Sequence, residues 1–270
     1  MDNRCVGVFD SGLGGLTCVK EIMKLLPYES IVYFGDTGRV PYGTRSAETI
    51  IKYTESDIRF LKQFDPKLII IACGTASSTA LEYVKDRFDV NIMGVVAPSA
   101  AAASSLTENG KIGVIGTNGS INSGKYEQYL KSLNKDLQVY SKACPMFVPL
   151  VENGYLDSKV TYMIAQEYLA PLMDAGVDTI ILGCTHYPLI KKVISDIVGQ
   201  HVALIDPGKE TALYARSTID AHEVDPAGKE PEYKFYISDF VDNFSHTASM
   251  FLQKEISGNI EKINIENYMV

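Results

Sequence analysis

The sequence predicts an α/β fold with two similar three-layer domains and mainly parallel sheets, and two observations lead to that prediction. Short apolar runs that end in small or polar residues alternate with longer stretches whose apolar residues recur at intervals of three and four. This alternation is typical of βαβ units, in which helices cover both faces of a parallel sheet. In addition, Gly7–Ser11 resembles Gly113–Thr117, and Ile70–Cys73 resembles Ile181–Cys184. These matches favour an internal duplication, although buried parallel strands resemble one another in any α/β protein.

The expected elements follow in chain order. The strands are Val6–Phe9, Ile31–Phe34, Leu68–Ala72, Ile92–Val96, Lys111–Ile115, Ile180–Leu182 and Val202–Ile205. The helices are Thr17–Leu26, Glu48–Phe64, Ser78–Phe88, Ser123–Leu133, Ser158–Ala175 and Leu189–Ile197. Several of these helices begin after Ser or Thr, whose side chains cap helix N-termini. We expect a turn at Asp206-Pro207-Gly208, directly after the last strand.

The duplication also predicts how the chain divides into domains. We expect residues 1–97 to form the first domain together with residues 208–270, and residues 98–207 to form the second. Ligands of open α/β sheets bind beyond the carboxyl ends of the strands. Two such halves that face each other would therefore enclose a ligand between equivalent strand ends. We expect the functional site in the cleft between the two domains.

Composition and charge narrow the class of protein. The 270 residues are 46% hydrophobic and 21% charged, as in an ordinary globular protein. A formal net charge of −8 opposes attraction to phosphate backbones, so we expect no nucleic-acid partner. The longest strongly apolar run, Leu68–Cys73, is far too short to cross a bilayer, and Met1–Phe9 lacks a signal-peptide pattern. We therefore expect a cytoplasmic protein that has no membrane partner.

Cysteine usage argues against both disulfides and structural metal. The five cysteines are Cys5, Cys18, Cys73, Cys144 and Cys184. An odd number does not suit a complete disulfide framework, and cytoplasmic thiols stay reduced. No CxxC or HExxH motif occurs, so the usual ligand pairs of zinc are missing. We expect free thiols and no metal site.

Two of the cysteines share an unusual local context. Cys73 and Cys184 each end an apolar strand-like run and lead into a turn before a helical pattern. A helix N-terminus stabilises a thiolate and can also bind a substrate carboxylate. Taken alone, each cysteine is as easily explained as a small buried apolar residue. The repeated context favours a pair of functional thiols that face each other across the cleft. His186, two residues after Cys184, adds a titratable group.

Three other segments carry candidate site residues. Asp10 ends the first strand and precedes a glycine-rich turn, which matches neither GxGxxG nor a P-loop. Asp10 therefore fits a polar site residue, or alternatively a helix cap. Gly35–Gly43 is a polar, glycine-rich loop of the kind that lines sites, although ordinary turn chemistry also explains it. Glu152 follows an apolar stretch and is able to hydrogen-bond a histidine, although solvated loop glutamates are commoner.

Five motifs together resemble those of the bacterial glutamate racemases. They are Phe9-Asp10-Ser11-Gly12-Leu13-Gly14-Gly15-Leu16-Thr17, Gly35-Asp36-Thr37 with Pro41-Tyr42-Gly43, Ala72-Cys73-Gly74-Thr75-Ala76, Pro149-Leu150-Val151-Glu152, and Gly183-Cys184-Thr185-His186-Tyr187-Pro188. Their order and spacing match as well, over roughly residues 5 to 210. Such an ordered set is far more specific than any single motif.

The resemblance implies cofactor-independent interconversion of L- and D-glutamate, which supplies D-glutamate for peptidoglycan, by an enzyme of two similar α/β domains that forms homodimers. It implies that Cys73 and Cys184 exchange the α-proton on opposite faces of the substrate. By the same analogy Asp10, Glu152 and His186 assist the thiols. The residues implied to contact substrate are Ser11, Tyr42, Gly43, Gly74, Thr75, Thr117 and Thr185. No cofactor is expected, and the small-molecule partner is glutamate.

One position departs from the family pattern. The Cys-Asn-Thr of the family is here Cys73-Gly74-Thr75, so an amide expected to hold the amino-acid head of the substrate is missing. One lost polar contact costs about 1–3 kcal/mol unless another donor, such as the Gly74 N–H, replaces it. The departure keeps two alternatives open. One is a related racemase that acts on aspartate or another amino acid, and the other is a binding or regulatory homologue with weak or no activity.

Overall fold

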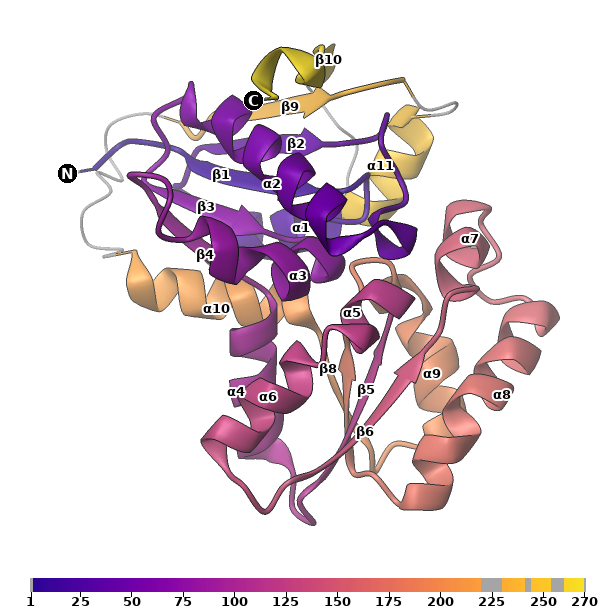
Figure 1. Ribbon diagram of the computed structural model, residues 1–270. Helices are drawn as coiled ribbons and strands as arrows, with labels where there is room; N and C mark the ends of the chain where they lie inside the picture. Colours follow the sequence, from indigo (N-terminus) through magenta and orange to yellow (C-terminus); the bar gives the residue numbers. More distant parts are fainter. Residues whose placement is uncertain (1, 220–229, 241–243, 254–259, 270) are drawn as a thin grey trace.

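The computed structural model describes residues 2–219, 230–240, 244–253 and 260–269, and it confirms the α/β fold class. Two parallel sheets lie in separate layered units, and helices pack on both faces of each sheet (Figure 1). The C-terminal segment that follows α10 (Pro207–Thr218) returns to the sheet that contains the N-terminus. Within the described ranges, no helix is long and apolar enough to span a membrane.

The first sheet has six strands in the order β10-β9-β2-β1-β3-β4. The strands are β1 (Val6–Asp10), β2 (Ile31–Gly35), β3 (Leu68–Ile71), β4 (Asn91–Gly94), β9 (Tyr233–Ile237) and β10 (Ile260–Lys262), and all the pairings are parallel. Side chains alternate between the two faces of β1. Val6 and Val8 therefore pack with Leu16 and Val19 of α1 (Leu16–Leu25) on one face, whereas Phe9 packs in the core on the other.

The remaining elements of this unit cover its two faces. They are η1 (Tyr42–Thr44), α2 (Ala47–Lys62), α3 (Gly74–Val84), α11 (Phe244–Leu252) and η3 (Ile265–Tyr268). The side chain of Ser46 caps α2 by accepting a hydrogen bond from the Thr49 N–H at 3.3 Å, as expected for a serine at this position. Helix α2 buries Ile58 and Leu61 against the sheet.

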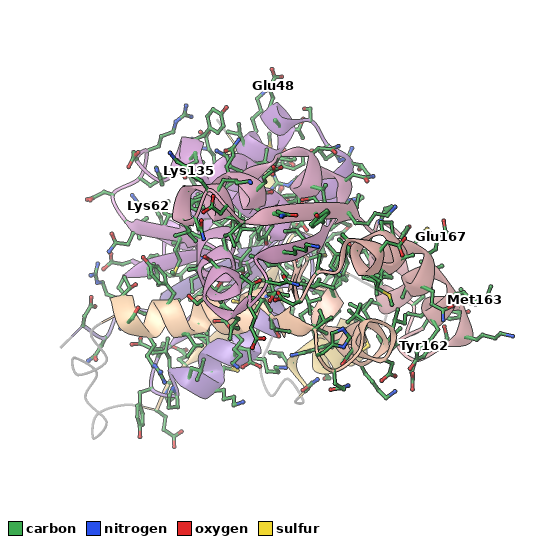
Figure 2. All side chains as sticks on the ribbon, turned by 90° about the horizontal axis from the view of Figure 1, so that it is seen from below. Glu48, Lys62, Lys135, Tyr162, Met163 and Glu167 are labelled. Atoms are coloured by element: carbon green, nitrogen blue, oxygen red, sulfur yellow. The ribbon has the colours of Figure 1, made fainter. Side chains whose placement is uncertain are left out.

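The second sheet has four strands in the order β6-β5-β7-β8. These are β5 (Lys111–Gly116), β6 (Gln138–Ala143), β7 (Thr179–Leu182) and β8 (Ala203–Ile205). The helical segments of this unit are α4 (Val96–Leu106), α5 (Asn118–Asn122), α6 (Lys125–Leu133), α7 (Phe147–Glu152), α8 (Lys159–Ala175), η2 (Tyr187–Ile190) and α9 (Lys191–Val198). On α8, Met163 and Glu167 are exposed on the outer face of the molecule (Figure 2).

The strand orders confirm the internal repeat that the sequence suggested. The series β2-β1-β3-β4 in the first sheet corresponds to β6-β5-β7-β8 in the second. The two matched segments are thereby explained, because β1 is equivalent to β5 and β3 is equivalent to β7. Cys73 and Cys184 consequently follow equivalent strands, β3 and β7, and neither strand lies at the edge of its sheet.

Several expected element bounds were wrong, each for a physical reason. The strand expected to reach Val96 stops at Gly94, and Val96 begins α4, an Ala- and Ser-rich helix with little amphipathic pattern. Asp206-Pro207-Gly208 is the start of α10 rather than a turn. Asp206 Oδ1 caps that helix by accepting from the Gly208 N–H at 2.9 Å, and Pro207 suits its first position. The sequence pattern did not predict strand β6, because it is an edge strand whose burial shows no clear alternation.

The division of the chain into domains stays a proposal. We propose that residues 1–97 and 208–270 form one domain and residues 98–207 the other. Of the C-terminal part, residues 220–229, 241–243, 254–259 and 270 lie outside the described residues. The support is strand membership: β1 to β4, β9 and β10 belong to one sheet, and β5 to β8 belong to the other.

Candidate active site

A pocket of about 360 Å³ lies in the cleft between the two units, at the carboxyl ends of the central strands. Its size is within the range of small-molecule sites. The lining includes eleven of the twelve residues expected from the sequence: Ser11, Tyr42, Gly43, Cys73, Gly74, Thr75, Thr117, Glu152, Cys184, Thr185 and His186. The twelfth, Asp10, is buried beside this lining and contacts two lining residues, Gly12 and Thr185. No Lys or Arg contributes to the pocket lining described here.

Cys73 lies at the N-terminus of α3, where the strand β3 gives way to the helix. Its Sγ accepts a hydrogen bond from the Ala76 N–H at 3.5 Å and lies 3.5 Å from the Ser11 hydroxyl. The side chain is almost completely buried. Burial and then the negative charge of Asp10 raise the pKa of Cys73 to about 12, although the Ala76 N–H and Ser11 act in the opposite direction. At neutral pH, Cys73 is therefore a thiol.

Cys184 follows β7 on the opposite wall and is adjacent to a histidine. Its Sγ lies 3.8 Å from Nδ1 of His186, and the other ring nitrogen, Nε2, lies 3.0 Å from Oε1 of Glu152. Burial disfavours the charged imidazolium, but the hydrogen bonds to Cys184 and Glu152 outweigh it and raise the pKa of His186 to about 10. His186 is therefore an imidazolium at neutral pH, and its Nδ1 faces the Cys184 sulfur.

Asp10 connects the first unit to the opposite wall of the pocket, which carries Cys184 and His186. Its Oδ2 accepts from the Gly12 N–H at 3.0 Å, and its Oδ1 accepts from the Thr185 hydroxyl at 3.4 Å. Burial raises the pKa of Asp10, while the charge of His186 and the N–H of Gly12 lower it. The carboxylate is thus held by groups from both walls. Thr17 adds a second link, because its hydroxyl donates to the Thr185 carbonyl at 3.1 Å.

A row of hydroxyls forms the floor between the two units. Thr75 Oγ1 of α3 lies 2.8 Å from Thr117 Oγ1 and 3.4 Å from Ser120 Oγ, both from the second unit. Thr117 in turn caps α5 by accepting from the Ser120 N–H at 3.1 Å. Hydroxyls can donate or accept, so this row can bind either a carboxylate or an ammonium group.

The comparisons with known proteins agree with this arrangement. A family model described as Asp/Glu/Hydantoin racemase matches residues 16–215. The chain belongs to this racemase family. Among curated relatives, a glutamate racemase of Geobacter metallireducens is 42% identical over 264 residues, which cover 97% of each chain. A glutamate racemase of Streptococcus pneumoniae (strain Hungary19A-6) is 44% identical over 259 residues, 95% of this chain and 97% of the relative.

A solved structure extends the likeness to three dimensions. The glutamate racemase of Francisella tularensis subsp. tularensis SCHU S4, determined in complex with D-glutamate, superposes with a TM-score of 0.92. Its sequence is 38% identical, and the match covers 99% of this racemase and 100% of that chain. The family predicted from five sequence motifs is therefore confirmed.

The racemase has a tight backbone contact at the position that departs from the family pattern. A Cβ placed on Gly74 would lie less than 3.0 Å from the carbonyl oxygen of Gly183, a distance that real Cβ atoms essentially never show. The two cysteine-bearing turns thus touch through their backbones. Gly14 is similar, because a Cβ there would collide with Thr185 Oγ1 and with the ring of His186.

Tyr42 lines the pocket in a way that its sequence motif did not indicate. Its hydroxyl donates to the buried carboxylate of Asp36 and also to Oδ2 of Asp57 at 3.0 Å, so the phenol end is engaged in the core. The side chain is only 1% exposed. The hydroxyl of Tyr42 is therefore committed to the protein itself.

Some lining residues of the racemase were not among the expected ones. They are Gly12, Val40, Pro41, Thr44, Asn118, Pro145, Val148, Pro149 and Gly183. Several stand next to an expected residue, as Asn118 follows Thr117 and Gly183 precedes Cys184, so proximity to a motif was the available signal. Nothing in the sequence pointed to Pro145 and Val148 as site residues, because apolar residues in an α/β protein usually pack in the hydrophobic core. Within the described residues, no cluster of His, Cys, Asp and Glu is suited to a metal ion.

Proposed function

We propose that this racemase interconverts L- and D-glutamate without a cofactor, with Cys73 and Cys184 as the two acid/base groups. The observation that carries the proposal is the presence of one thiol from each unit in a single pocket, each at the end of an equivalent strand. The names of the relatives and the D-glutamate bound to the Francisella protein support glutamate as the substrate.

Racemisation requires a base and an acid on opposite faces of one carbon. A thiolate on one side removes the α-proton and becomes a thiol, and the electron pair of the broken C–H bond is delocalised into the substrate carboxylate. The thiol on the other side then donates its proton to the α-carbon and becomes a thiolate. Proton and charge are conserved, and the two cysteines have exchanged protonation states. The reverse reaction uses the same groups in exchanged roles.

The surroundings favour one starting state. Cys73, with its pKa raised to about 12, begins as the thiol, whereas the Cys184 sulfur lies 3.8 Å from Nδ1 of the His186 imidazolium. We propose that Cys184 is the base in the resting enzyme and that Cys73 is the acid. Asp10 provides a buried carboxylate on the Cys73 side, and Glu152 orients and charges His186 on the other.

Neutral donors hold the substrate in this proposal. Because no Lys or Arg lines the described pocket, the two carboxylates of glutamate are bound by hydroxyls and backbone N–H groups. Ser11, Thr75, Thr117 and Thr185 supply hydroxyls, while Tyr42, Gly43 and Gly74 supply backbone N–H groups. Together with the α3 N-terminus, such pre-placed donors stabilise the charge that develops on the carboxylate during proton removal.

The direct experiment is incubation with L-glutamate in deuterium oxide. We expect the circular dichroism signal of L-glutamate to decay to zero while deuterium enters the α-carbon. Absence of both changes, with folded protein present, would refute the proposal. L-aspartate is assayed in parallel, and racemisation of aspartate alone would instead assign the related activity.

Three further parts of the proposal follow from the same family. We propose that the product D-glutamate serves peptidoglycan synthesis, and that the reaction takes place in the cytoplasm, where the thiols stay reduced. We also propose a homodimer. Light scattering during size-exclusion chromatography tests it, and a single species with the mass of one chain would contradict it.

A further inference from the structure

One wall of the pocket is a single continuous segment, Val40–Thr44, which connects β2 to α2. It contributes five consecutive lining residues. Segments that connect elements are usually the more mobile parts of a fold. A segment that has to present backbone N–H groups to a ligand needs a device that fixes it, and the residue just before it, Arg39, supplies one.

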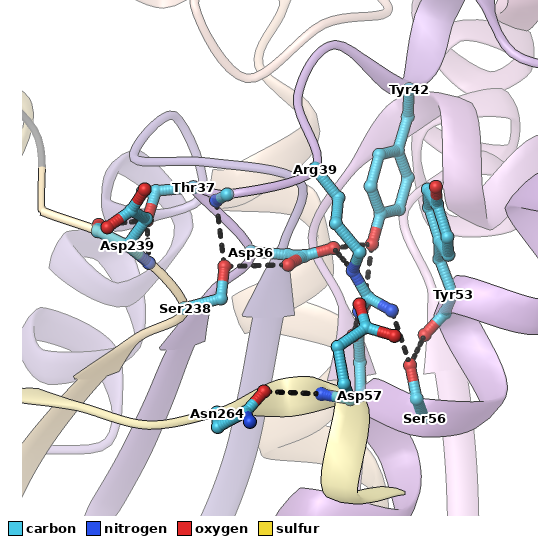
Figure 3. Close-up of polar contacts among 12 residues, drawn as sticks. Asp36, Thr37, Arg39, Tyr42, Tyr53, Ser56, Asp57, Ser238, Asp239 and Asn264 are labelled. Carbon is cyan, nitrogen blue, oxygen red and sulfur yellow. Dashed lines mark hydrogen bonds and ion pairs between the residues drawn. The ribbon is translucent and has the colours of Figure 1, made fainter. Parts of the chain in front are cut away.

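The Arg39 side chain is buried and does not line the pocket, and two carboxylates hold it (Figure 3). Its Nε donates to Asp36 Oδ2 at 2.6 Å, and its Nη2 donates to Asp57 Oδ1 at 2.6 Å. A third nitrogen, Nη1, donates to Ser56 Oγ at 3.0 Å. The guanidinium carbon also lies 4.2 Å from the centre of the Tyr53 ring, in cation–π geometry. Asp36 and Asp57 are fully buried, and Arg39 is only 8% exposed.

The Val40–Thr44 wall also contacts this cluster of Asp36, Arg39 and Asp57, through the Tyr42 side chain. Its hydroxyl donates to Asp36 and, at 3.0 Å, to Asp57, so both carboxylates hold Arg39 and Tyr42 at once. Arg39 precedes the wall and Tyr42 lies in its middle. The two ends of a four-residue stretch are thus fixed by one pair of carboxylates, one from the loop and one from α2.

The cluster is anchored on its far side as well. Ser238, just after β9, donates to Asp36 Oδ1 at 2.8 Å and accepts from the Gly38 N–H at 2.8 Å (Figure 3). The Asp36 N–H donates to the carbonyl of Asp10 at 3.0 Å. The turn that carries Arg39 is therefore bound to Ser238 after β9 and to Asp10 at the end of β1.

Burial of these charges is not explained by stability alone. Transfer of ionised groups out of water is costly, and replacement of a buried ion pair by apolar residues often leaves a protein equally stable. Two carboxyl groups also face one guanidinium, and burial and the negative charge of Asp36 raise the pKa of Asp57. Such a cluster is more useful for its directional geometry, since the planar fork of arginine fixes the relative positions of its partners.

We propose that Arg39 is a positioning residue, which holds the Val40–Thr44 wall in its substrate-binding conformation through Asp36, Asp57 and Tyr42. The proposal rests on the proposed function for the identity of the substrate. It assigns to Arg39 an effect on substrate binding although its side chain does not line the pocket.

Arg39→Lys is the primary test variant, because lysine keeps the positive charge but lacks the planar guanidinium whose three nitrogens contact Asp36, Ser56 and Asp57. We expect hydrogen–deuterium exchange of the peptide that covers Gly38–Arg45 to become at least about 10-fold faster, and KM for glutamate to rise by about 10-fold or more with a smaller change in kcat. Arg59→Lys is the matched control. Arg59 lies on α2 two residues from Asp57 and pairs with Glu55 at 3.4 Å, outside the cluster.

Asp57→Asn supplies a second, conservative variant. Asparagine keeps an oxygen for Arg39 Nη2, and its amide can donate to the Tyr42 hydroxyl, which still donates to Asp36. We expect loop exchange and KM to stay within about threefold of the wild-type values, whereas Asp57→Ala behaves like Arg39→Lys.

The exchange measurement needs no substrate, so the two proposals fail separately. An inactive wild-type enzyme refutes glutamate racemisation and leaves the exchange result to decide the role of Arg39. Unchanged exchange at Gly38–Arg45 in Arg39→Lys overturns the positioning role whatever the activity. Faster exchange with an unchanged KM in an active enzyme overturns it too. Faster exchange limited to that segment, with a raised KM, supports it.

Discussion

Nε2 of His186 lies 3.0 Å from Oε1 of Glu152, while the opposite ring nitrogen faces the sulfur of Cys184 at 3.8 Å. This relay connects a half-exposed carboxylate to a buried thiol through one imidazole. Since the carboxylate reaches solvent, its charge is partly screened, yet its hydrogen bond still fixes the orientation of the imidazolium ring.

Glu152→Gln should shift the pH dependence of the reaction. Glu152 is one of the groups that raise the pKa of His186 to about 10, so the neutral glutamine lowers that pKa. The imidazolium that supports Cys184 is then lost at lower pH. In Glu152→Gln we expect the alkaline limb of the pH profile of kcat/KM to move toward neutral pH. In His186→Asn we expect kcat itself to fall by ~10²–10⁴. Glu167→Gln on the outer face of α8 is the control (Figure 2). An unmoved alkaline limb in Glu152→Gln would argue against the relay.

The same histidine makes stability depend on pH. Its pKa in the folded protein, about 10, lies above the usual 6.5, so the folded state binds the extra proton more tightly. Its stabilising contribution is therefore complete below about pH 6.5 and is lost as the pH rises through about 10. Denaturant unfolding of the wild type and of His186→Asn across this range measures it. The stability difference between the two proteins should shrink as the pH rises, and a constant or growing difference would contradict the assignment.

The two thiols should differ in reactivity. Near neutral pH, Cys73 is almost wholly protonated because its pKa is about 12, whereas Cys184, the proposed base, lies 3.8 Å from Nδ1 of the His186 imidazolium. Thiolates, not thiols, react with iodoacetamide. Peptide mass spectrometry after limited alkylation should find Cys184 labelled first, and saturating glutamate should protect it. Preferential labelling of Cys73 would reverse the proposed roles of base and acid in the resting enzyme.

Removal of either thiol should stop inversion but not every proton exchange. In Cys73→Ser, Cys184 can still remove a proton and return one to the same face. We expect racemisation to fall by more than ~10³, while solvent deuterium still enters one enantiomer without inversion. Cys184→Ser should show the opposite preference. Cys5→Ser, far from the pocket lining, is the control. Equal deuterium entry into both enantiomers in a one-thiol variant would contradict the two-base mechanism.

The sequence predicted the fold class and the position of the candidate site residues for a clear physical reason. Parallel strands buried on both faces are short apolar runs, and residues at their carboxyl ends converge on one edge of the sheet. Cys73, Cys184 and Thr117 follow β3, β7 and β5 and meet in one pocket for that reason. Asp10 at the end of β1 was found in the same way.

What the sequence did not predict depends on side-chain direction and on contacts between distant segments. The Tyr42 hydroxyl turns into the core, because two buried carboxylates from different elements converge on it. Arg39 and Asp57 are separated along the chain and carry no joint pattern. Likewise, Gly74 looked like a lost contact, and only the three-dimensional arrangement revealed the Gly183 carbonyl against it.

The contact between Gly74 and Gly183 leads to the last prediction. A Cβ at position 74 would collide with a backbone carbonyl, which cannot rotate away as a flexible side chain can, so the two cysteine-bearing turns would have to separate. Proton transfer depends steeply on the approach of both thiols to one carbon, and a displacement of about 1 Å costs up to about 10²-fold. We expect Gly74→Ala to lower kcat by ~10–10² while the free energy of unfolding changes far less.

Gly74→Asn restores the residue that the family pattern has at this position, and it introduces the same Cβ. If a better grip on the amino-acid head outweighs the collision, Gly74→Asn will lower KM and keep kcat, and the separation argument is then wrong. If the backbone contact dominates, as we expect, both variants lose kcat alike. Gly7→Ala is the control, because a Cβ there would meet only ordinary contacts with Ile69 and Leu61 at 3.4 Å.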